Sequence, residues 1–403
     1  MSFYSVWQNP NLRRLIAARF ISNLGNGLAP IAIPFGVFSI KGATATSLSL
    51  VWVATFLPLV VFTLFGGVIG DRYPRAKLVG GADVLLGLLV ITNGFALITH
   101  NGRIWLFLFV GFTGGILNAI WYPSMAALTT DLADEKILQE SNSSIMLSSN
   151  VAMIIGSSIG GVLVAAIGPG WAIFIDGCSF LLAGGLVYSL NVSAMPNKTR
   201  ESNWNELRSG WQEFISHKWI VAIVAASPII FGVERAVYSV IGPVVANEKL
   251  GGPKPWSVIL VFWGFGSIVG VLIAGKFKPK FPIRFALGSQ FPILFWIFGL
   301  SFLKSIVILS ILALLVGVAM DMFYVFWVTT IQQHVAKDSL SKVLAYDAWG
   351  AMSLSPIILG VAGPLTQHIG TQRTLVISGS IYLLALILPL LVKEVRSIQA
   401  ISN

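Results

Sequence analysis

The sequence predicts an all-α membrane protein whose twelve transmembrane helices form two six-helix repeats. Apolar residues make up 56% of the chain and charged residues only 10%, whereas a soluble domain carries about 25% charged residues. The apolar residues are grouped in successive runs of about 20 or more, the length that crosses a bilayer core of about 30 Å. These runs do not alternate apolar and polar residues, which excludes a β-barrel.

Twelve such runs follow one another and leave almost nothing for a soluble domain. Each should be helical, because backbone polar groups in hydrocarbon must be hydrogen-bonded within their own segment. The expected spans are 15–40, 47–70, 78–99, 104–129, 143–167, 171–192, 219–246, 256–275, 283–303, 306–334, 343–365 and 374–392.

The longest polar connection lies near the middle of the chain. We therefore expect an N-terminal six-helix bundle over 1–192, a cytoplasmic linker over 193–218 and a C-terminal six-helix bundle over 219–403. The linker is expected to contain an amphipathic helix, because its apolar residues share one helical face. They are Trp204, Leu207, Trp211, Phe214 and Ile215. Asn203 followed by Glu206 is typical of a capping box. The alternative is a polar linker with incidental aromatic residues.

The two halves are related by an internal repeat at an offset of 202 residues. Gly168 and Gly177 correspond to Gly370 and Gly379, and Tyr122 corresponds to Tyr324. Paired repeats of this kind commonly hold a site between them near the bilayer midplane.

Lys and Arg are distributed unequally between the two sets of loops. Eighteen lie on the side of the termini and six on the other side. The positive-inside rule therefore predicts that both termini are cytoplasmic, in a multi-pass protein of the plasma (inner) membrane. The net charge of +10 reflects this topology. No nucleic-acid partner is expected, because the basic residues are scattered over many loops.

Several kinds of chemistry find no support in the sequence. Cys178 is the only cysteine, which excludes an intrachain disulfide and a multi-cysteine metal site. The chain has no Gly-x-x-x-x-Gly-Lys-Ser/Thr motif for nucleotide phosphates. The four histidines lie in or beside loops and form no ligand cluster. We expect no enzyme activity, no cofactor and no metal.

A dense group of charges separates the second and third spans. Gly67 is followed by Asp71, Arg72 and Arg75 before apolar sequence resumes. Charges spaced this closely mark a tight loop at a membrane face. The pattern resembles the loop signature of the major facilitator superfamily, in which a glycine, three residues and Asp-Arg precede further basic residues. Pro74 stands where that signature usually has glycine.

Further segments resemble the macrolide-efflux and enterobactin-exporter branch of that superfamily. They are Asn9 to Leu15, Ser22 to Gly25, Tyr122 to Ser124, Leu128 to Asn142 and Gly156 to Phe180. The resemblance covers essentially the whole chain and implies the major facilitator fold. One departure is Ser157, which replaces a proline that drug antiporters often carry in the fifth span.

The resemblance also implies a function. We expect a secondary active transporter that exports amphipathic small molecules, drug- or macrolide-like or siderophore-like, by proton antiport with alternating access. Its partners would be a small-molecule substrate, protons and membrane lipid, and we expect a monomer. An importer or facilitator of a small metabolite is one alternative, and a non-transporting membrane sensor or assembly factor is another, because fold alone does not separate them.

Charged residues inside the spans are the main candidates for function, because they are costly in hydrocarbon. Glu234 and Arg235 lie near the middle of the seventh span, and Asp321 lies near the middle of the tenth. Burial favours the neutral form of a carboxyl group, so we expect these three residues to take part in proton coupling or substrate contact. The alternative is a permanent ion pair that holds the halves together.

The other charged residues of the spans are expected nearer the membrane faces. Arg19 should extend to the cytoplasmic face, Asp83 and Asp347 lie near cytoplasmic span ends, and Asp176 lies near the outer end of span six.

Gly25 should let the first span approach its neighbours closely. Further candidates for lining the cavity are Asn23, Asn26, Asn118, Tyr122, Tyr324 and Trp327. For the aromatic residues, lipid contact or core packing is the alternative.

In the superfamily, the aspartate of the loop signature and its basic neighbours form charge contacts that close the cytoplasmic side. The resemblance implies this role for Asp71, with Gly67, Arg72 and Arg75 as the remainder of a cytoplasmic gate. For the basic residues, the alternative is ordinary positive-inside charge.

Overall fold

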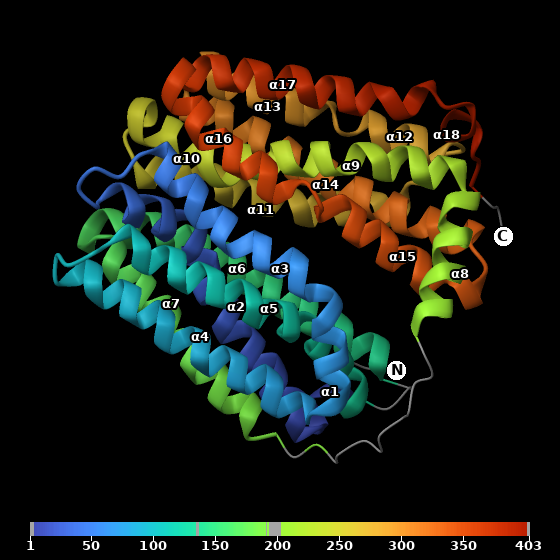
Figure 1. The fold of residues 1–403 in the computed structure, drawn as a ribbon, viewed down its shortest axis with the longest axis horizontal. Helices are drawn as coiled ribbons and strands as arrows, with labels where there is room; N and C mark the ends of the chain where they lie inside the picture. Colours follow the sequence, from blue (N-terminus) through green and yellow to red (C-terminus); the bar gives the residue numbers. More distant parts are fainter. Residues whose placement is uncertain (1–3, 134–136, 191, 193–202, 401–403) are drawn as a thin grey trace. The chain divides into compact units, whose positions relative to one another are not determined.

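The computed structural model describes residues 4–133, 137–190, 192 and 203–400, and within these ranges the chain forms helices and no β-strand (Figure 1). Twelve helical segments of this part of the chain are long and apolar enough to cross a membrane, as predicted. Those of the first half are α2 (Pro10–Phe38), α3 (Ala45–Arg72), α4 (Arg75–Ile98), α5 (Ile104–Leu132), α6 (Leu138–Ile167) and α7 (Pro169–Tyr188).

The spans of the second half are built partly from consecutive shorter helices. They are α9 (Lys218–Ala236) continued by η1 (Val237–Ile241), α10 (Gly242–Val245) and η2 (Ala246–Leu250); α11 (Pro253–Lys276); α12 (Pro282–Gly288) with α13 (Phe291–Phe302); α14 (Ile306–His334); α15 (Lys337–Met352) with α16 (Ser355–Ile369); and α17 (Thr371–Ile387) with η3 (Leu388–Leu391). The short helices α1 (Tyr4–Gln8), α8 (Asn203–Ser216) and α18 (Lys393–Ser397) lie outside the spans.

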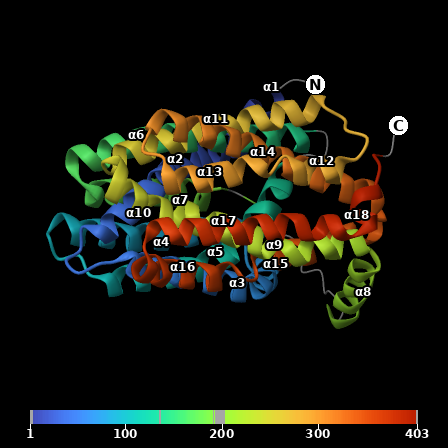
Figure 2. The ribbon, with the colours of Figure 1, turned by 90° about the horizontal axis from the view of Figure 1, so that it is seen from above.

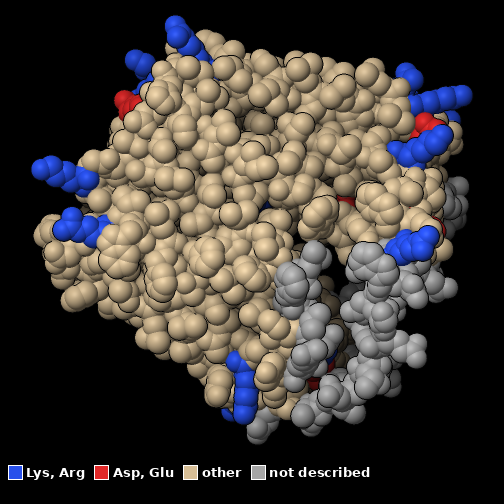
Figure 3. All heavy atoms as spheres, in the orientation of Figure 1, with Lys and Arg blue, Asp and Glu red and all other residues tan. Residues whose placement is uncertain are grey.

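The surface of the helices is apolar over a broad area. On the face shown in Figure 3, Lys and Arg side chains lie at the margins, and the surface between them is almost free of charge. Large apolar side chains such as Leu272, Val307 and Leu384 are exposed. A water-soluble protein rarely exposes a contiguous apolar surface of this kind, so this surface faces hydrocarbon.

The chain divides into two compact units. The first comprises Met1–Lys198 and Gly251–Ser257, and the second comprises Thr199–Leu250 and Val258–Asn403. The linker helix α8 therefore groups with the second unit, and the beginning of α11 groups with the first.

In the first unit, α4 and α7 lie side by side along a seam of glycines (Figure 1). The facing pairs are Gly80–Gly184, Gly87–Gly177 and Gly94–Gly170. Both helices thus present a glycine every seven residues, and a Cβ atom on Gly80 would lie 2.6 Å from the backbone nitrogen of Tyr188. Small residues of this kind let transmembrane helices approach closely, so the seam determines which residues of α4 and α7 meet.

In the second unit, α11 and α14 approach one another in the same way. A Cβ atom on Gly270 would lie 2.5 Å from the carbonyl oxygen of Val318, and one on Gly317 would lie 2.7 Å from the nitrogen of Ser267. Ser267 of α11 therefore lies against Gly317, which is one helical turn before Asp321 on α14. Figure 2 shows α17 alongside α9, which packs against it in the same unit.

The internal repeat predicted from the sequence is visible in the backbone. Gly168 ends α6 and begins the passage to α7 at φ 90° and ψ 160°, and Gly370 joins α16 to α17 at φ 87° and ψ 155°. These positive φ values favour glycine. Tyr122 and Tyr324, which correspond at the same offset, are both exposed.

The linker contains a helix, α8, at the position predicted for it. Its Trp211 and Phe214 rings pack against Tyr346 of α15, with centroid distances of 5.4 and 5.8 Å. Part of its apolar face is therefore covered by α15, while Trp211 and Ile215 remain about half exposed. The side chains of Asn203, Trp204, Glu206 and Leu207, and with them the predicted capping box, lie outside the described part of the chain.

Candidate functional site

A cavity of about 470 Å³ lies inside the first unit. Helices α2 to α7 all contribute to its wall. The volume is within the range of about 300–1,000 Å³ that is typical of small-molecule sites. Its polar lining residues are Arg19, Ser22, Asn23, Asn26, Thr55, Asp83, Asn93, Asn118, Trp121, Tyr122 and Asp176.

Arg19 lines this cavity, and the expectation that it extends to the cytoplasmic face is wrong. Arg19 is only 9% exposed, and its guanidinium carbon lies 4.5 Å from the centroid of the Trp121 ring. Asp83 of α4 lies within electrostatic range of Arg19. A cation over an indole face gains cation–π attraction, which is larger where water is excluded. These partners stabilise the charge inside the unit, so the side chain has no need to reach the surface.

Asp83 and Asp176 also line the cavity. Asp83 is 3% exposed and Asp176 is 5% exposed. Asp83 Oδ2 and Asp176 Oδ1 have no hydrogen-bond partner among the described residues. An unsatisfied buried polar group costs about 1–3 kcal/mol, and more when it is charged. Both carboxyl groups are therefore candidates for contact with a bound molecule.

Asp176 lies directly against α2. The Ser179 hydroxyl donates a hydrogen bond of 2.7 Å to the backbone carbonyl of Asp176 and leaves the carboxylate free of that contact. A side chain on Gly25 would occupy the place of Asp176 Oδ1 and the Ser179 hydroxyl. Gly25 thus permits the close approach expected of it, and the missing side chain leaves room for Asp176 Oδ1 against α2.

The asparagines of the cavity wall differ in what they bind. Asn23 Nδ2 donates to the Arg19 carbonyl at 2.8 Å and to Ser149 Oγ at 3.0 Å. Asn118 Nδ2 donates to the Gly114 carbonyl at 2.9 Å. Asn93 is 4% exposed, and its Oδ1 has no partner in the described part of the chain. Asn23, Asn26 and Asn118, proposed from the sequence, thus share a cavity with Asn93, which was not.

The three candidate aromatic residues lie in different environments. Tyr122 lines the cavity and is partly exposed, and its ring packs edge-on against Trp121 at 5.3 Å. Tyr324 is exposed. Trp327 is buried, lies 5.5 Å from the Trp219 ring and donates a 3.0 Å hydrogen bond to Asp347 Oδ2. For Trp327 the structure therefore shows core packing.

The second unit brings together the three charged residues singled out from the sequence. Glu234 lies within electrostatic range of both Arg235 and Asp321, which come from α9 and α14. Ser267 lies beside the Asp321 carboxyl group. Tyr238 and Tyr382 lie near Glu234. The result is two carboxyl groups and one guanidinium that influence one another.

The surroundings of this cluster are aromatic and locally irregular. The π-helical turn η1 begins two residues after Arg235. Tyr238, on η1, packs edge-on against Trp263 at 5.1 Å. The Tyr382 hydroxyl donates to Gln290 Oε1 at 3.4 Å. Single π-helical turns occur frequently at functional sites, and this one directs Tyr238 towards the acidic cluster.

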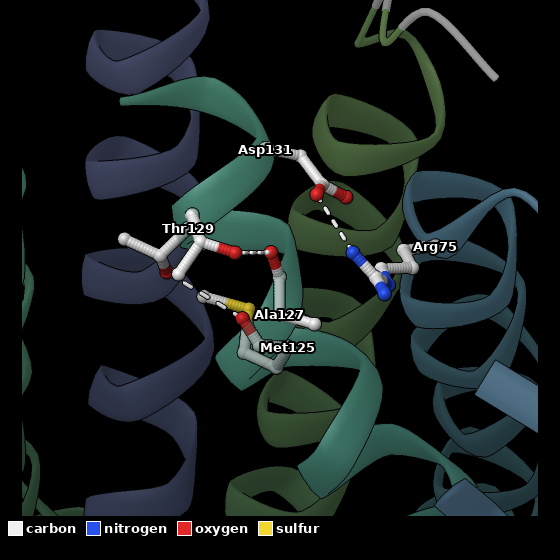
Figure 4. Close-up of polar contacts among 6 residues, drawn as sticks. Arg75, Met125, Ala127, Thr129 and Asp131 are labelled. Atoms are coloured by element: carbon white, nitrogen blue, oxygen red, sulfur yellow. Dashed lines mark hydrogen bonds and ion pairs between the residues drawn. The ribbon is translucent and has the colours of Figure 1, made fainter. Parts of the chain in front are cut away.

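Of the candidate gate residues, Gly67, Asp71 and Arg72 lie in the last two turns of α3, and their side chains are outside the described part of the chain. Arg75 is described and forms an ion pair of 2.7 Å with Asp131 at the end of α5. Figure 4 shows Arg75 pointing from α4 towards this carboxylate, next to the hydrogen bond of Thr129 to the Met125 carbonyl. The pair joins the beginning of α4 to the end of α5.

Asp83, Asn93 and Asp176 are among the lining residues of the first-unit cavity that were not selected from the sequence as site residues. The signal that marks them is the seven-residue glycine spacing of both helices. Asp83 and Asn93 lie next to the glycine seam of α4, and Asp176 lies next to that of α7. Polar residues beside a close helix contact are turned into the bundle, away from lipid. Among the described residues, no group of three or more His, Cys, Asp or Glu is placed to hold a metal ion.

Comparison with known sequences identifies the same family. The family model of the Major Facilitator Superfamily matches residues 15–358. The chain is 22% identical to the enterobactin exporter EntS of Citrobacter koseri, over 96% of this chain and 93% of that protein. It is 20% identical to macrolide efflux protein A of Streptococcus pyogenes, over 99% and 98% of the two chains.

Solved structures of transporters share the fold. The nucleoside transporter NupG superposes with a TM-score of 0.74 at 11% identity, over 95% of this chain and 98% of NupG. A bacterial homologue of the iron transporter ferroportin in an inward-facing state superposes with a TM-score of 0.72 at 16% identity, over 97% and 99% of the two chains. The chain therefore belongs to the Major Facilitator Superfamily and is a multi-pass membrane transporter of small molecules, not an enzyme.

Proposed function

We propose that this transporter exports amphipathic small molecules across the plasma membrane in exchange for protons, by alternating access. The observation that carries the proposal is that two relatives named as exporters match more than nine-tenths of the chain. Their named substrates, enterobactin and macrolides, differ from one another. The proposal therefore takes from them the direction of transport and leaves the substrate to be determined.

Glu234 and Asp321 are the proposed coupling groups. When both are ionised, the cluster they form with Arg235 carries a net charge of −1, and one proton neutralises it. Burying an unpaired charge costs several kcal/mol, so the cluster favours the form with one proton bound. The electrostatic range between the two acids supports this role, because the charge of one then influences protonation of the other.

The proposed orientation places both termini in the cytoplasm, on the basis of the Lys and Arg distribution. Asp71, with Gly67 and Arg72, is proposed to form the cytoplasmic gate, on the basis of the loop signature. Arg75 supports the gate indirectly, because its ion pair with Asp131 holds the beginning of α4.

Transport by the purified protein in proteoliposomes tests the function. A fluorescent amphiphile is followed with an imposed pH gradient, with the gradient reversed and with no gradient. We expect uphill movement opposite to the proton flow, with no uphill movement in protein-free liposomes. Movement in the same direction as protons would support the importer, and gradient-independent equilibration would support the facilitator. Absence of movement for every amphiphile tested would favour the sensor or assembly factor.

A further inference from the structure

We propose that the cavity inside the first unit binds an organic cation with N–H donors, such as a protonated primary amine, through Asp176 and Asn93. The inference that such a cation is the transported substrate rests on the proposed export function. The inference that the cavity binds it rests on the cavity alone and is tested separately.

The oxygens that lack partners in the cavity wall indicate a donor ligand. Asp83 Oδ2, Asn93 Oδ1 and Asp176 Oδ1 belong to residues that are at least 95% buried, and none has a hydrogen-bond partner in the described ranges. All three residues line the same cavity. Trp121 Nε1, a donor without a partner by the same criterion, lies beside Asp83. A ligand that donates hydrogen bonds would remove the cost of the unsatisfied acceptors, whereas a ligand with acceptors alone would not.

The charges around the cavity indicate a cation. Arg19 is already engaged by the Trp121 ring and by Asp83. No basic side chain of the described residues forms an ion pair with Asp176. The cavity therefore holds one basic and two acidic groups, and the acid without a partner is Asp176. A single positive charge beside Asp176 would compensate it.

Asn93 and Asp176 lie at neighbouring levels of the helix pair. Gly94 of α4 lies against Phe174 of α7, and Gly177 lies against Ile91. These two contacts bracket Asn93 on one helix and Asp176 on the other, so both residues can reach one ammonium group. Asp83 precedes Asn93 by ten residues, which is about 15 Å along the helix, and it belongs with Arg19.

The size of the cavity favours an organic cation over a bare metal ion. One water molecule occupies about 30 Å³ of liquid, and the cavity of about 470 Å³ is many times larger. A bare ion would leave most of this space to water. Ile173 and Phe180, one turn to either side of Asp176 on α7, line the same wall and would contact the apolar part of an organic ligand.

Binding to the purified full-length protein in lipid nanodiscs tests the proposal, with phenethylammonium as the probe. Two matched analogues separate the charge of the probe from its donors. The N,N,N-trimethyl analogue keeps the charge without N–H donors, and 2-phenylethanol keeps a donor without the charge. Exchange of choline chloride for sodium chloride in the buffer tests a bare metal ion. Calorimetry should show phenethylammonium binding at least about tenfold more tightly than either organic analogue. Equal affinity of the trimethyl analogue, or stabilisation by sodium alone, would overturn the assignment.

Substitutions then locate the site. Asp176→Asn should weaken phenethylammonium binding at least about tenfold, and Asn93→Leu should weaken it several-fold. Asp347→Asn, at a partly buried acid of the second unit, is the matched control and should bind as the unmodified protein does. If Asp176→Asn is not monodisperse, Asn93→Leu and the probe series decide. Unchanged affinity in both cavity variants overturns the proposal. If binding follows this pattern but the protein shows no proton-coupled transport, the proposed export function is wrong and the binding site remains supported.

Discussion

In the first unit, Arg19 lies over the Trp121 ring and within electrostatic range of Asp83, whereas Asp176 forms no ion pair with the described residues. In the second unit, Glu234 lies within electrostatic range of both Arg235 and Asp321. The candidate site of each unit therefore contains one arginine and two carboxyl groups. The first leaves a solitary acid facing an open space, which suits a ligand. The second couples its acids, which suits uptake and release of one proton.

The largest effect is expected from the coupled acids. Glu234→Gln or Asp321→Asn should abolish substrate accumulation driven by a pH gradient, a loss of at least about tenfold, because the cluster no longer exchanges a proton. Downhill movement of the substrate should persist. Transport in proteoliposomes with and without the gradient measures both quantities.

The same variants sharpen the comparison between the units. They should bind phenethylammonium with the affinity of the unmodified protein, because the first-unit cavity is lined without Glu234 or Asp321. Loss of this binding would show that ligand binding and proton coupling are not separated between the two units. Full gradient-driven transport by both variants would make the acids structural.

A smaller effect on transport is expected at the end of α3. Asp71→Asn should reduce turnover several-fold and leave substrate affinity nearly unchanged, because a gate biases the balance between conformations without contacting the substrate. Initial rates over a range of substrate concentrations separate the two parameters. Undiminished turnover would remove the gate assignment.

Adjacent glycines provide a matched test of the seam that orients the first-unit cavity. Gly80→Ala should destabilise the protein by about 1–3 kcal/mol, because its methyl group would meet the backbone of α7 at 2.6 Å. Gly81→Ala is the control, since no atom lies within 4 Å of its Cβ position, and alanine favours a helix by up to about 1 kcal/mol. Thermal unfolding in detergent measures both, and equal midpoints for the two variants would contradict the seam.

The corresponding contact of the second unit extends that test. Gly270→Ala should lower the unfolding midpoint, because its methyl group would lie 2.5 Å from the Val318 carbonyl. Gly275→Ala has open space and is the control. Because the seam of the second unit places Ser267 beside Asp321, Gly270→Ala should also reduce gradient-driven transport while phenethylammonium binding persists. If Gly270→Ala lost phenethylammonium binding and kept gradient-driven transport, the assignment of binding to the first unit and of proton coupling to the second would be contradicted.

A further stability test concerns the Arg75–Asp131 pair. Asp131→Asn should cost about 1.5–3 kcal/mol, the range for a hydrogen bond to a charged group, because its side chain is only 4% exposed. The double variant Arg75→Gln/Asp131→Asn should lose less than the sum of the single changes. Strictly additive losses would mean that the two side chains stabilise the protein independently.

Some features of the candidate site were open to prediction and others were not. Glu234, Arg235 and Asp321 attract notice because they interrupt long apolar runs near their middle, where charge is most costly. Asp176 lies nearer the beginning of its run and was placed at a membrane face. Its depth in the unit depends on the packing of α7 against α4 and on the absence of a side chain at Gly25, which involve residues about 80 and 150 positions earlier.

The sequence by itself determined the number of spans and their approximate limits, because the length of an apolar run and the charges at its ends are local properties. It also determined the repeat, since Gly168 and Gly370 must both provide a positive φ where one span turns into the next. Only the tertiary structure decided which face of each helix meets which neighbour. Arg19 contacts Trp121, 102 residues later, because α2 packs against α5, and no periodicity within either helix specifies that contact.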